Sequence, residues 1–224
     1  MITVDLLNTM GDDLAVVNAA RVSFAKEVTQ MSLKDVGLIK FLAKNKHRSP
    51  FNHCFLSFRV KAPIFVARQL VKHEYLPFNE VSRRYVDTEP ELYTPKVWRA
   101  KAEDKKQGSS EETIDLLDIV TDYELGWYQT AEDLYECVST DQVDLYKAMI
   151  KAGVCPEQAR MVLPLNTMTE WIWSGSLGAF MKMVNLRDHD HAQYETRLVA
   201  KLIAEYIEQE FPESYKALRE FPNV

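Results

Sequence analysis

The pattern of apolar and polar positions at the start of the chain predicts one strand followed by two helices. A loose alternation over residues 2–7 indicates a short strand. Helical spacing over residues 12–24, with acidic residues in the first turn, indicates a helix. Ser32, followed three positions later by Asp35, is typical of a capping box, so we expect a second helix from there to about Lys46.

The clearest strand pattern lies at residues 53–62, where the sequence alternates with a period of two. One face of this strand would carry Cys54, Leu56, Phe58 and Val60, and the other His53, Phe55, Ser57 and Arg59. Pro63 suits the first position of a helix, which we expect to end near His73. A strand that is buried on its apolar face should therefore lead directly into a helix.

The middle of the chain combines an irregular segment with a long helix. Residues 74–112 contain several prolines and a polar stretch, which predicts a loop. From Leu116 onward apolar residues return every three or four positions, which predicts a long helix. We expect this helix to break near residues 139–141 and to resume as far as Gly153, a favourable helix stop.

The last third of the chain is again rich in helices. The predicted elements are a short helix at 156–160, a strand at 165–173, and helices at 177–186 and 191–211. Because helices dominate and strands do not alternate with them regularly, the fold class is predicted to be α+β, helix-rich with a small, mostly antiparallel sheet. No repeat or linker divides the sequence, so residues 1–224 are expected to form a single domain.

Composition places this chain among soluble, enzyme-sized proteins. Of its 224 residues, 46% are hydrophobic and 27% charged, which excludes wholesale disorder. A net charge of −6 argues against a general nucleic-acid or membrane-surface binder. No apolar run approaches the roughly 18 residues of a transmembrane helix, and the N-terminus lacks the basic region of a signal peptide. Three widely spaced cysteines fit a reducing compartment, so we expect a cytoplasmic protein with neither nucleic acid nor membrane as partner.

Several common motifs for binding and catalysis are missing. Only seven glycines occur, and neither G-x-G-x-x-G nor G-x-x-x-x-G-K is found among them. No C-x-x-C pair is present. A nucleotide bound to this chain must therefore be held in another way, most plausibly by arginines and helix N-termini.

Two features suggest metal or nucleophilic chemistry, and both have simpler explanations. The run at residues 188–191, Asp-His-Asp-His, contains metal-ligating side chains, but ligands two positions apart do not share a helix face. Acidic residues in the first turn of a helix explain it without a metal. Cys54 lies on the apolar strand face, opposite His53, whereas Cys155 precedes a helix whose N-terminus could lower its pKa. We expect no metal site and no cysteine nucleophile.

The arginines are more informative than the cysteines. Arg68 lies in an apolar helix, where a cation needs a partner. Taken singly, such arginines are more often structural ion-pair partners than ligands. Taken together, several arginines and polar residues provide the forks and donors that recognition of a nucleoside monophosphate needs. These residues are Gln69, Glu80, Ser82, Arg83, Arg84, Arg160 and Arg187.

Three stretches carry a resemblance to a known family: residues 47–85, 157–166 and 185–195. The chain resembles the flavin-dependent thymidylate synthase family over nearly its whole length. The family signature runs from an Arg-His-Arg triplet through two serines to Arg-Tyr. The matching residues here are Lys72-His73-Glu74, Pro77, Asn79-Glu80, Ser82 and Arg84-Tyr85. Order and spacing agree, whereas Lys72, Glu74 and Pro77 replace two arginines and the first serine.

These substitutions fall in the part of the signature that the family uses to contact its flavin. The family uses the basic triplet beside its flavin, so Glu74 replaces a cation there, and Lys72 keeps a charge without the arginine fork. A further flavin contact of the family falls at residues 176–178, and a nearby asparagine becomes Lys182. We hypothesise that Lys182 supplies the cation lost at Glu74. The departures, and a longer region at 99–141, favour a divergent branch such as a viral one, in which case the compartment would be the host cytoplasm.

The resemblance implies a reaction. Members convert dUMP to dTMP with a methylene group from 5,10-methylenetetrahydrofolate and a hydride from FAD that NADPH has reduced, in a homotetramer whose subunits share each site. The implied catalytic residues are Arg187 and His53. Arg187 would stabilise charge at the uracil edge, and His53 would pack near flavin and folate. The implied substrate-binding residues are Gln69, Glu80, Ser82, Arg83, Arg84, Arg160 and Arg187. The implied cofactor-binding residues are Phe55, Lys72, His73, Glu74, Asn79, Ser176, Gly178 and Lys182.

The sequence leaves other functions open. The altered signature is compatible with a catalytically weakened member that binds FAD or a nucleotide without forming dTMP. A non-enzymatic helical interaction protein would bind neither flavin nor dUMP. A conventional cysteine-dependent thymidylate synthase is disfavoured, because the Pro-Cys-His segment of its nucleophile is missing. His53 could also be simply a satisfied strand residue.

Overall fold

The computed structural model describes residues 1–103, 109–116 and 130–222. Its strands are β1 (Thr3–Met10), β2 (Phe55–Pro63), β3 (Phe78–Glu80), β4 (Trp98–Lys101), β5 (Ser109–Ile114) and β6 (Met168–Ser176). Its α-helices are α1 (Asp13–Arg21), α2 (Leu33–Lys44), α3 (Ile64–Leu70), α4 (Ala131–Lys151), α5 (Pro156–Ala159), α6 (Leu177–Arg187), α7 (Tyr194–Glu210) and α8 (Pro212–Glu220). The predicted α+β class is confirmed. None of these helices is both long and apolar enough to span a membrane.

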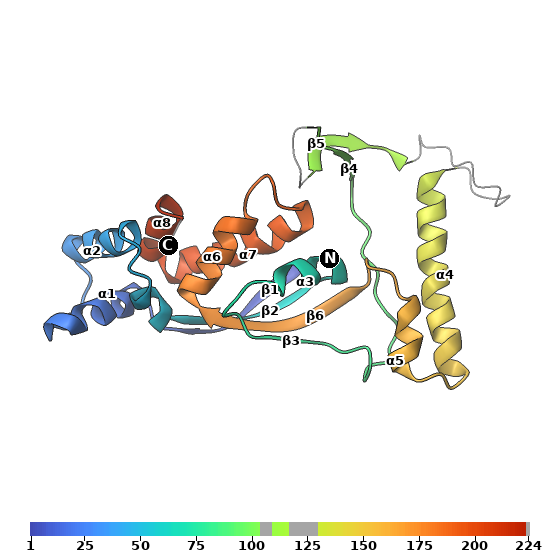
Figure 1. The fold of residues 1–224 in the computed structure, drawn as a ribbon, viewed down its shortest axis with the longest axis horizontal. Helices are drawn as coiled ribbons and strands as arrows, with labels where there is room; N and C mark the ends of the chain where they lie inside the picture. The colour runs from blue at the N-terminus through green and yellow to red at the C-terminus, as the bar shows by residue number, and fades with distance from the viewer. Residues whose placement is uncertain (104–108, 117–129, 223–224) are drawn as a thin grey trace.

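A four-stranded antiparallel sheet organises the molecule, with strand order β1-β2-β6-β3. The predicted apolar face of β2 is confirmed, since Leu56, Phe58 and Val60 are all buried. Helices α6 and α7 lie on one side of this sheet (Figure 1). Phe180 of α6 packs edge-on against Phe58 of β2 and Trp173 of β6, with ring centroids 5.0 and 5.4 Å apart. This aromatic cluster holds α6 on the sheet.

Helices α1, α2 and α8 gather at one end of the sheet (Figure 1). The predicted capping box at the start of α2 is present, and its Asp35 also pairs with Arg21 of α1. Asp13 joins the two ends of the chain, because its carboxylate accepts hydrogen bonds from the backbone N–H groups of Glu213 and Ser214 at 2.8 and 2.9 Å. A residue of the first helix thereby caps the last one.

Several predicted boundaries are wrong for local reasons. β2 begins at Phe55, because residues Ser49–His53 form the short 3₁₀ helix η2 around Pro50, so His53 is not a strand residue. The expected loop contains β3, β4 and the first part of β5, whose short lengths hide any alternation. The strand expected at 165–173 is displaced to β6, Met168–Ser176.

The helical predictions also need correction. α4 runs unbroken through residues 139–141, where Ser139 is buried within the helix. Part of the long helix expected from Leu116 lies outside the described residues. The helix expected at 191–211 begins at Tyr194, and a further helix, α8, follows it from Pro212. A proline at the start of a helix is favourable, so Pro212 marks a new helix as well as the end of the previous one.

We expect Asp13→Ala to lower the free energy of unfolding by about 1–2 kcal/mol, because two N–H groups at the start of α8 lose their acceptor. Urea denaturation followed by circular dichroism measures the change. Asp5→Ala, which removes an exposed carboxylate from β1, is the control and should change stability by less than about 0.5 kcal/mol. Equal stability of the two variants would contradict the proposed cap.

Candidate functional site

The centre of the candidate site is where the segment after α3 meets the end of α6. Arg187, the last residue of α6, donates from Nε to Nε2 of His73 at 2.9 Å. An imidazole nitrogen accepts only while it carries no proton. Burial, together with the positive charges of Arg187 and Lys182, lowers the pKa of His73 to about 4. The ring is therefore neutral near pH 7 and serves as acceptor for a half-buried arginine.

A cavity of about 440 Å³ opens beside this pair. Its lining residues are Arg68, Gln69, Lys72, Arg187, His191, Ala192 and Gln193. The structure thus brings two predicted residues of the α3 segment, Gln69 and Lys72, together with the predicted Arg187 of α6. Two cations from the α3 segment and one from α6 give the cavity a positive lining suited to an anionic ligand.

Gln69 is held in one orientation. Its side-chain nitrogen donates to the side-chain oxygen of Gln193, and its oxygen accepts from the Thr196 hydroxyl at 3.1 Å. Both partners lie at or near the start of α7, so the amide of Gln69 is fixed by α7 before any ligand arrives. A fixed amide distinguishes donors from acceptors on the edge of a flat ring better than a rotating one.

Glu80 lies close to this cavity, at the end of β3. Its carboxylate accepts a hydrogen bond from the Thr169 hydroxyl at 2.9 Å and lies 3.9 Å from the guanidinium of Arg68. Glu80 is therefore the ion-pair partner that we expected for a cation in this apolar helix, although the side chain of Arg68 is largely exposed. Asn79 precedes Glu80 and pairs through the backbone with Ile172 of β6.

Four other predicted substrate residues lie outside the lining of this cavity: Ser82, Arg83, Arg84 and Arg160. Arg84 donates to the Ser82 hydroxyl at 3.3 Å and lies over the Tyr85 ring. Arg83 donates to a backbone carbonyl five residues away, and Arg160 to one three residues away. Within one chain these arginines make local contacts and do not join Arg187.

A second cavity, of about 330 Å³, lies at the start of α6. Its lining residues are Arg48, Phe51, Asn52, Phe55, Tyr75, Ser176, Gly178, Ala179 and Lys182. Four of them, Phe55, Ser176, Gly178 and Lys182, belong to the predicted cofactor set. The ring of Phe55 is 44% exposed although it belongs to a central strand.

The backbone at the start of α6 closely approaches the segment 48–52. The Ser176 hydroxyl accepts from the N–H of Ala179 at 3.2 Å, which caps the helix, and donates to the Asn52 side chain at 2.8 Å. A Cβ atom at Gly178 would overlap the side-chain oxygen of Asn52, so any larger residue there would have to displace Asn52 from its hydrogen bond with Ser176. At the other side of the cavity Lys182 lies 3.9 Å from the carboxylate of Glu74.

The remaining predictions have mixed outcomes. His53 is exposed and lines neither cavity. The run at 188–191 does not form the first turn of a helix, because it joins α6 to α7; Asp188 pairs with Arg219 and Asp190 with Arg197. Within the part of the chain that the structure describes, no three potential ligand residues gather around a metal position.

Cys54 is unsuited to nucleophilic attack. Its side chain is fully buried, and burial together with the negative charges of Asp12 and Asp13 raises the pKa of the thiol to about 11. Cys155 is exposed at the start of the short helix α5. Neither thiol lines the cavities beside Arg187 and Lys182.

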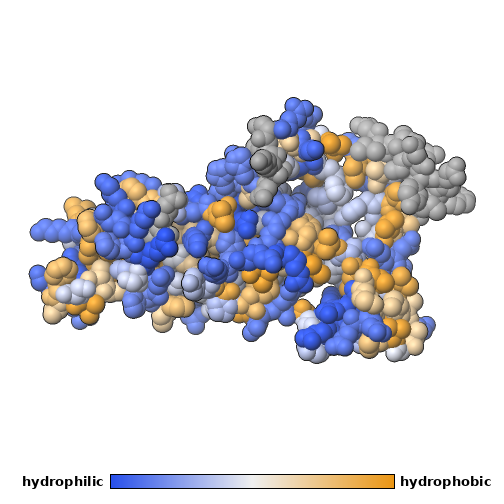
Figure 2. All heavy atoms as spheres, in the orientation of Figure 1, coloured by the Kyte–Doolittle hydropathy of each residue, from blue (hydrophilic) through white to orange (hydrophobic). Residues whose placement is uncertain are grey.

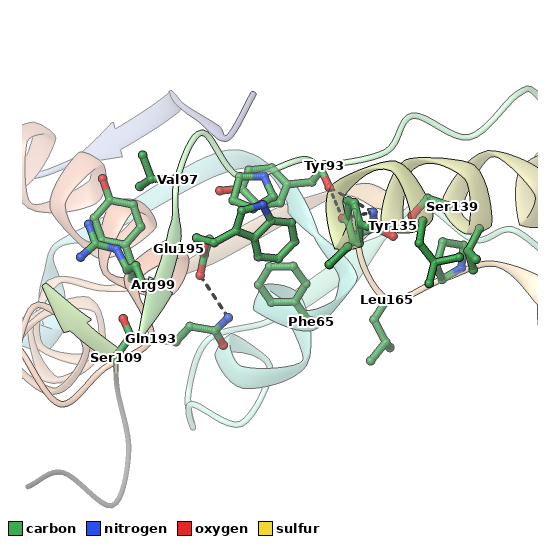
Figure 3. A pocket seen from close by; sticks show the side chains of 18 of the residues that line it. Phe65, Tyr93, Val97, Arg99, Ser109, Tyr135, Ser139, Leu165, Gln193 and Glu195 are labelled. Carbon is green, nitrogen blue, oxygen red and sulfur yellow. Dashed lines mark hydrogen bonds between the residues drawn. The ribbon is translucent and has the colours of Figure 1, made fainter. Parts of the chain in front are cut away.

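Sequence reasoning missed a third and larger cavity, of about 1000 Å³, between α4, β4 and the start of α7 (Figure 3). The surface is hollowed on this side of the sheet, with apolar residues around the hollow (Figure 2). The backbone oxygen of Tyr93 accepts from the Tyr135 hydroxyl and the Asn166 amide, each at 3.1 Å. Gln193 lines both this cavity and the one beside Arg187.

Some of the missed residues had a detectable signal. Arg48 and Asn52 fall in the first stretch that carries the family resemblance, Asn166 in the second and Gln193 in the third. No sequence pattern indicated Tyr135, because it follows the irregular segment and its hydrogen-bond partners are distant in sequence.

At pH 8, we expect Cys155 to react with iodoacetamide within minutes while Cys54 in the folded protein stays unmodified for hours. A pKa of about 11 leaves about one Cys54 side chain in a thousand as thiolate, and burial blocks access as well. Mass spectrometry of tryptic peptides measures each site, and the urea-unfolded protein is the control in which both react. Equal reactivity in the folded state would contradict the buried, protonated thiol.

Comparison with known proteins finds relatives over nearly the whole chain. Residues 5–213 match the family model described as thymidylate synthase complementing protein. A flavin-dependent thymidylate synthase of Thermus thermophilus is 38% identical over 217 residues, which are 97% of this chain and 75% of that protein. One from Thermosipho africanus is 37% identical over 96% of this chain and 90% of its own length.

A solved structure has the same fold. It is the crystal structure of a UMP/dUMP methylase from Streptomyces cacaoi bound with 5-Br dUMP, 28% identical, with a TM-score of 0.83 over 100% of this chain and 97% of that one. The sequence matches extend over nearly the whole chain, and the structural match covers all of it. The chain belongs to the flavin-dependent thymidylate synthase family.

Proposed function

We propose that this protein converts dUMP to dTMP, with 5,10-methylenetetrahydrofolate as one-carbon donor and FAD, reduced by NADPH, as hydride carrier. The observation that carries the proposal is the meeting of Arg187, Lys72 and the oriented Gln69 around one cavity, in a chain of this family. We further propose a cytoplasmic protein whose 224 residues act as one domain.

The cavity beside Arg187 is the proposed nucleotide site. The guanidinium of Arg187 supplies positive charge where the uracil edge becomes anionic during methylene transfer. The amide of Gln69 addresses the donors and acceptors of the same base edge, and Lys72 and Arg68 provide further positive charge for a phosphate. Activation of this kind is electrostatic and needs no thiolate, in agreement with the buried thiol of Cys54.

The cavity at the start of α6 is the proposed place of part of the flavin. Phe55 and Tyr75 offer aromatic rings, Arg48 and Lys182 offer cations, and Gly178 permits close approach of backbone. The cavity, about 330 Å³, is smaller than FAD, so the rest of the cofactor extends beyond it. FAD, when bound, supplies the hydride. His53, the exposed last residue of η2, remains a proposed contact of flavin or folate.

The assembly is proposed to be a homotetramer that shares its sites. Support comes from Ser82, Arg83, Arg84 and Arg160, which lie away from Arg187 in one chain. The three arginines donate to carbonyl or hydroxyl oxygens of their own neighbourhood rather than to carboxylates. Their charges thus stay available to the phosphate of a nucleotide held by a neighbouring copy.

The test is an anaerobic absorption spectrum of the purified protein, reconstituted with FAD, before and after NADPH and dUMP are added. We expect a flavin spectrum that bleaches, and dTMP, detected by chromatography, once methylenetetrahydrofolate is supplied. Arg187→Gln, which removes the cation at the base edge, should lower the rate on the order of 100-fold. Flavin that binds without any dTMP would instead support a weakened member of the family, and a protein that binds neither FAD nor dUMP would overturn the proposal.

Lys182 is the proposed source of the positive charge that the family has at the position of Glu74. Lys182→Ala should weaken FAD binding about tenfold, because the cavity at α6 loses a charged donor. Glu74→Arg, which restores a cation at that position, should leave FAD binding equal or tighter. Lys201→Ala, on the exposed side of α7, is the matched control. Flavin fluorescence titration measures all three, and a large loss in Glu74→Arg would show that Glu74 has a role of its own.

A further inference from the structure

We propose that His73 is a positioning residue, whose Nε2 atom holds the guanidinium of Arg187 in the orientation that the nucleotide site requires. The inference deepens the proposed function and rests on it, since it assigns Arg187 to that site. It differs from the flavin contact that the family resemblance implies for His73, because the partner observed in the structure is the arginine.

Arg187 has an unusual partner for a half-buried arginine. A half-buried arginine is usually compensated by a carboxylate. The nearest carboxylate in sequence, Asp188, is already paired with Arg219 at 2.8 Å. Among the ion pairs of the described residues none includes Arg187, and its Nε donates to the imidazole instead. A neutral acceptor fixes the direction of the guanidinium without cancelling its charge, so the full positive charge acts on the cavity.

Arg187 contacts His73 through Nε and not through a terminal nitrogen. The guanidinium has five N–H donors in a rigid plane, and the hydrogen bond to His73 occupies the one on Nε. Among the hydrogen bonds of the described residues, none uses the four donors on the terminal nitrogens, and Arg187 lines the cavity. Because the group is planar, holding Nε sets the plane in which those donors point.

The contact also requires one protonation state of the His73 ring. Nε2 accepts from Arg187, so the proton of the neutral ring must lie on Nδ1. An imidazolium could not accept and would face the charges of Arg187 and Lys182, which together with burial disfavour protonation. Lys72 and Glu74 flank His73 in sequence, Glu74 is 3.9 Å from Lys182, and Arg68 and His191 line the cavity beside the pair.

The nitrogen-15 chemical shifts of the His73 ring test the contact directly in the ligand-free protein. We expect the signature of an Nδ1–H ring with unprotonated Nε2 at pH 7, assigned by comparison with His73→Gln. In Arg187→Gln the shifts should move toward the Nε2–H form. A wild-type ring that carries its proton on Nε2, or that does not respond to Arg187→Gln, would overturn the inference whatever the activity of the enzyme.

Activity of the FAD-reconstituted enzyme gives a second readout. His73→Phe keeps a flat ring without an acceptor and should lower kcat on the order of 100-fold, because Arg187 is no longer oriented. His73→Gln, whose amide oxygen can replace Nε2 as acceptor, should recover most of that loss. In the Arg187→Lys background, His73→Phe should have little further effect, since the planar group is absent. Equal defects in the Phe and Gln variants, or additive effects with Arg187→Lys, would contradict a positioning role.

The two readouts separate the possible failures. A wild-type protein that shows the expected ring signature but forms no dTMP would overturn the proposed function and leave the contact standing. A protein that forms dTMP without that signature would overturn the contact between His73 and Arg187 and leave the proposed function standing.

Discussion

The pairing of β2 with β6 is the interaction on which the rest of this structure depends. The two strands are antiparallel and paired along their whole lengths, from Phe55 opposite Ser176 to Pro63 opposite Met168. Each strand leads without a loop into a helix, β2 into α3 and β6 into α6. Because the strands run in opposite directions, the two helices start at opposite ends of the pair and approach each other.

This geometry explains where the charged residues gather. Nine paired residues span roughly 30 Å, and helices of seven and eleven residues span roughly 10 and 16 Å. The C-terminal ends of α3 and α6 therefore meet near the middle, which is where His73 contacts Arg187. Helix C-termini carry partial negative charge and stabilise nearby cations, so the same arrangement supports Lys72 beside the end of α3 and Arg187 at the end of α6.

Features set by nearby residues could be predicted from the sequence. The buried face of β2, the capping box of α2 and the strand-to-helix step at Pro63 depend on neighbours within a few positions, and all three are confirmed. Two prolines begin helices that we did not predict. Pro50 turns the chain into η2 and removes His53 from the strand, and Pro212 starts α8. The contacts of Arg187 with His73 and of Gln69 with Gln193 link positions more than a hundred residues apart, so no local pattern reveals them.

Gln193 joins two regions of the molecule that ligands would enter separately. Its side-chain oxygen accepts from Gln69 in the cavity beside Arg187, while its nitrogen donates to Glu195 at 3.1 Å on the side of the larger cavity. The side-chain amide of Gln193 thus borders both cavities, and its two hydrogen bonds fix which side its oxygen and its nitrogen face. Rotating it to suit an occupant of the larger cavity would present nitrogen to the nitrogen of Gln69. The two cavities therefore cannot be remodelled independently, and a change of contents in one alters the hydrogen-bond pattern offered by the other.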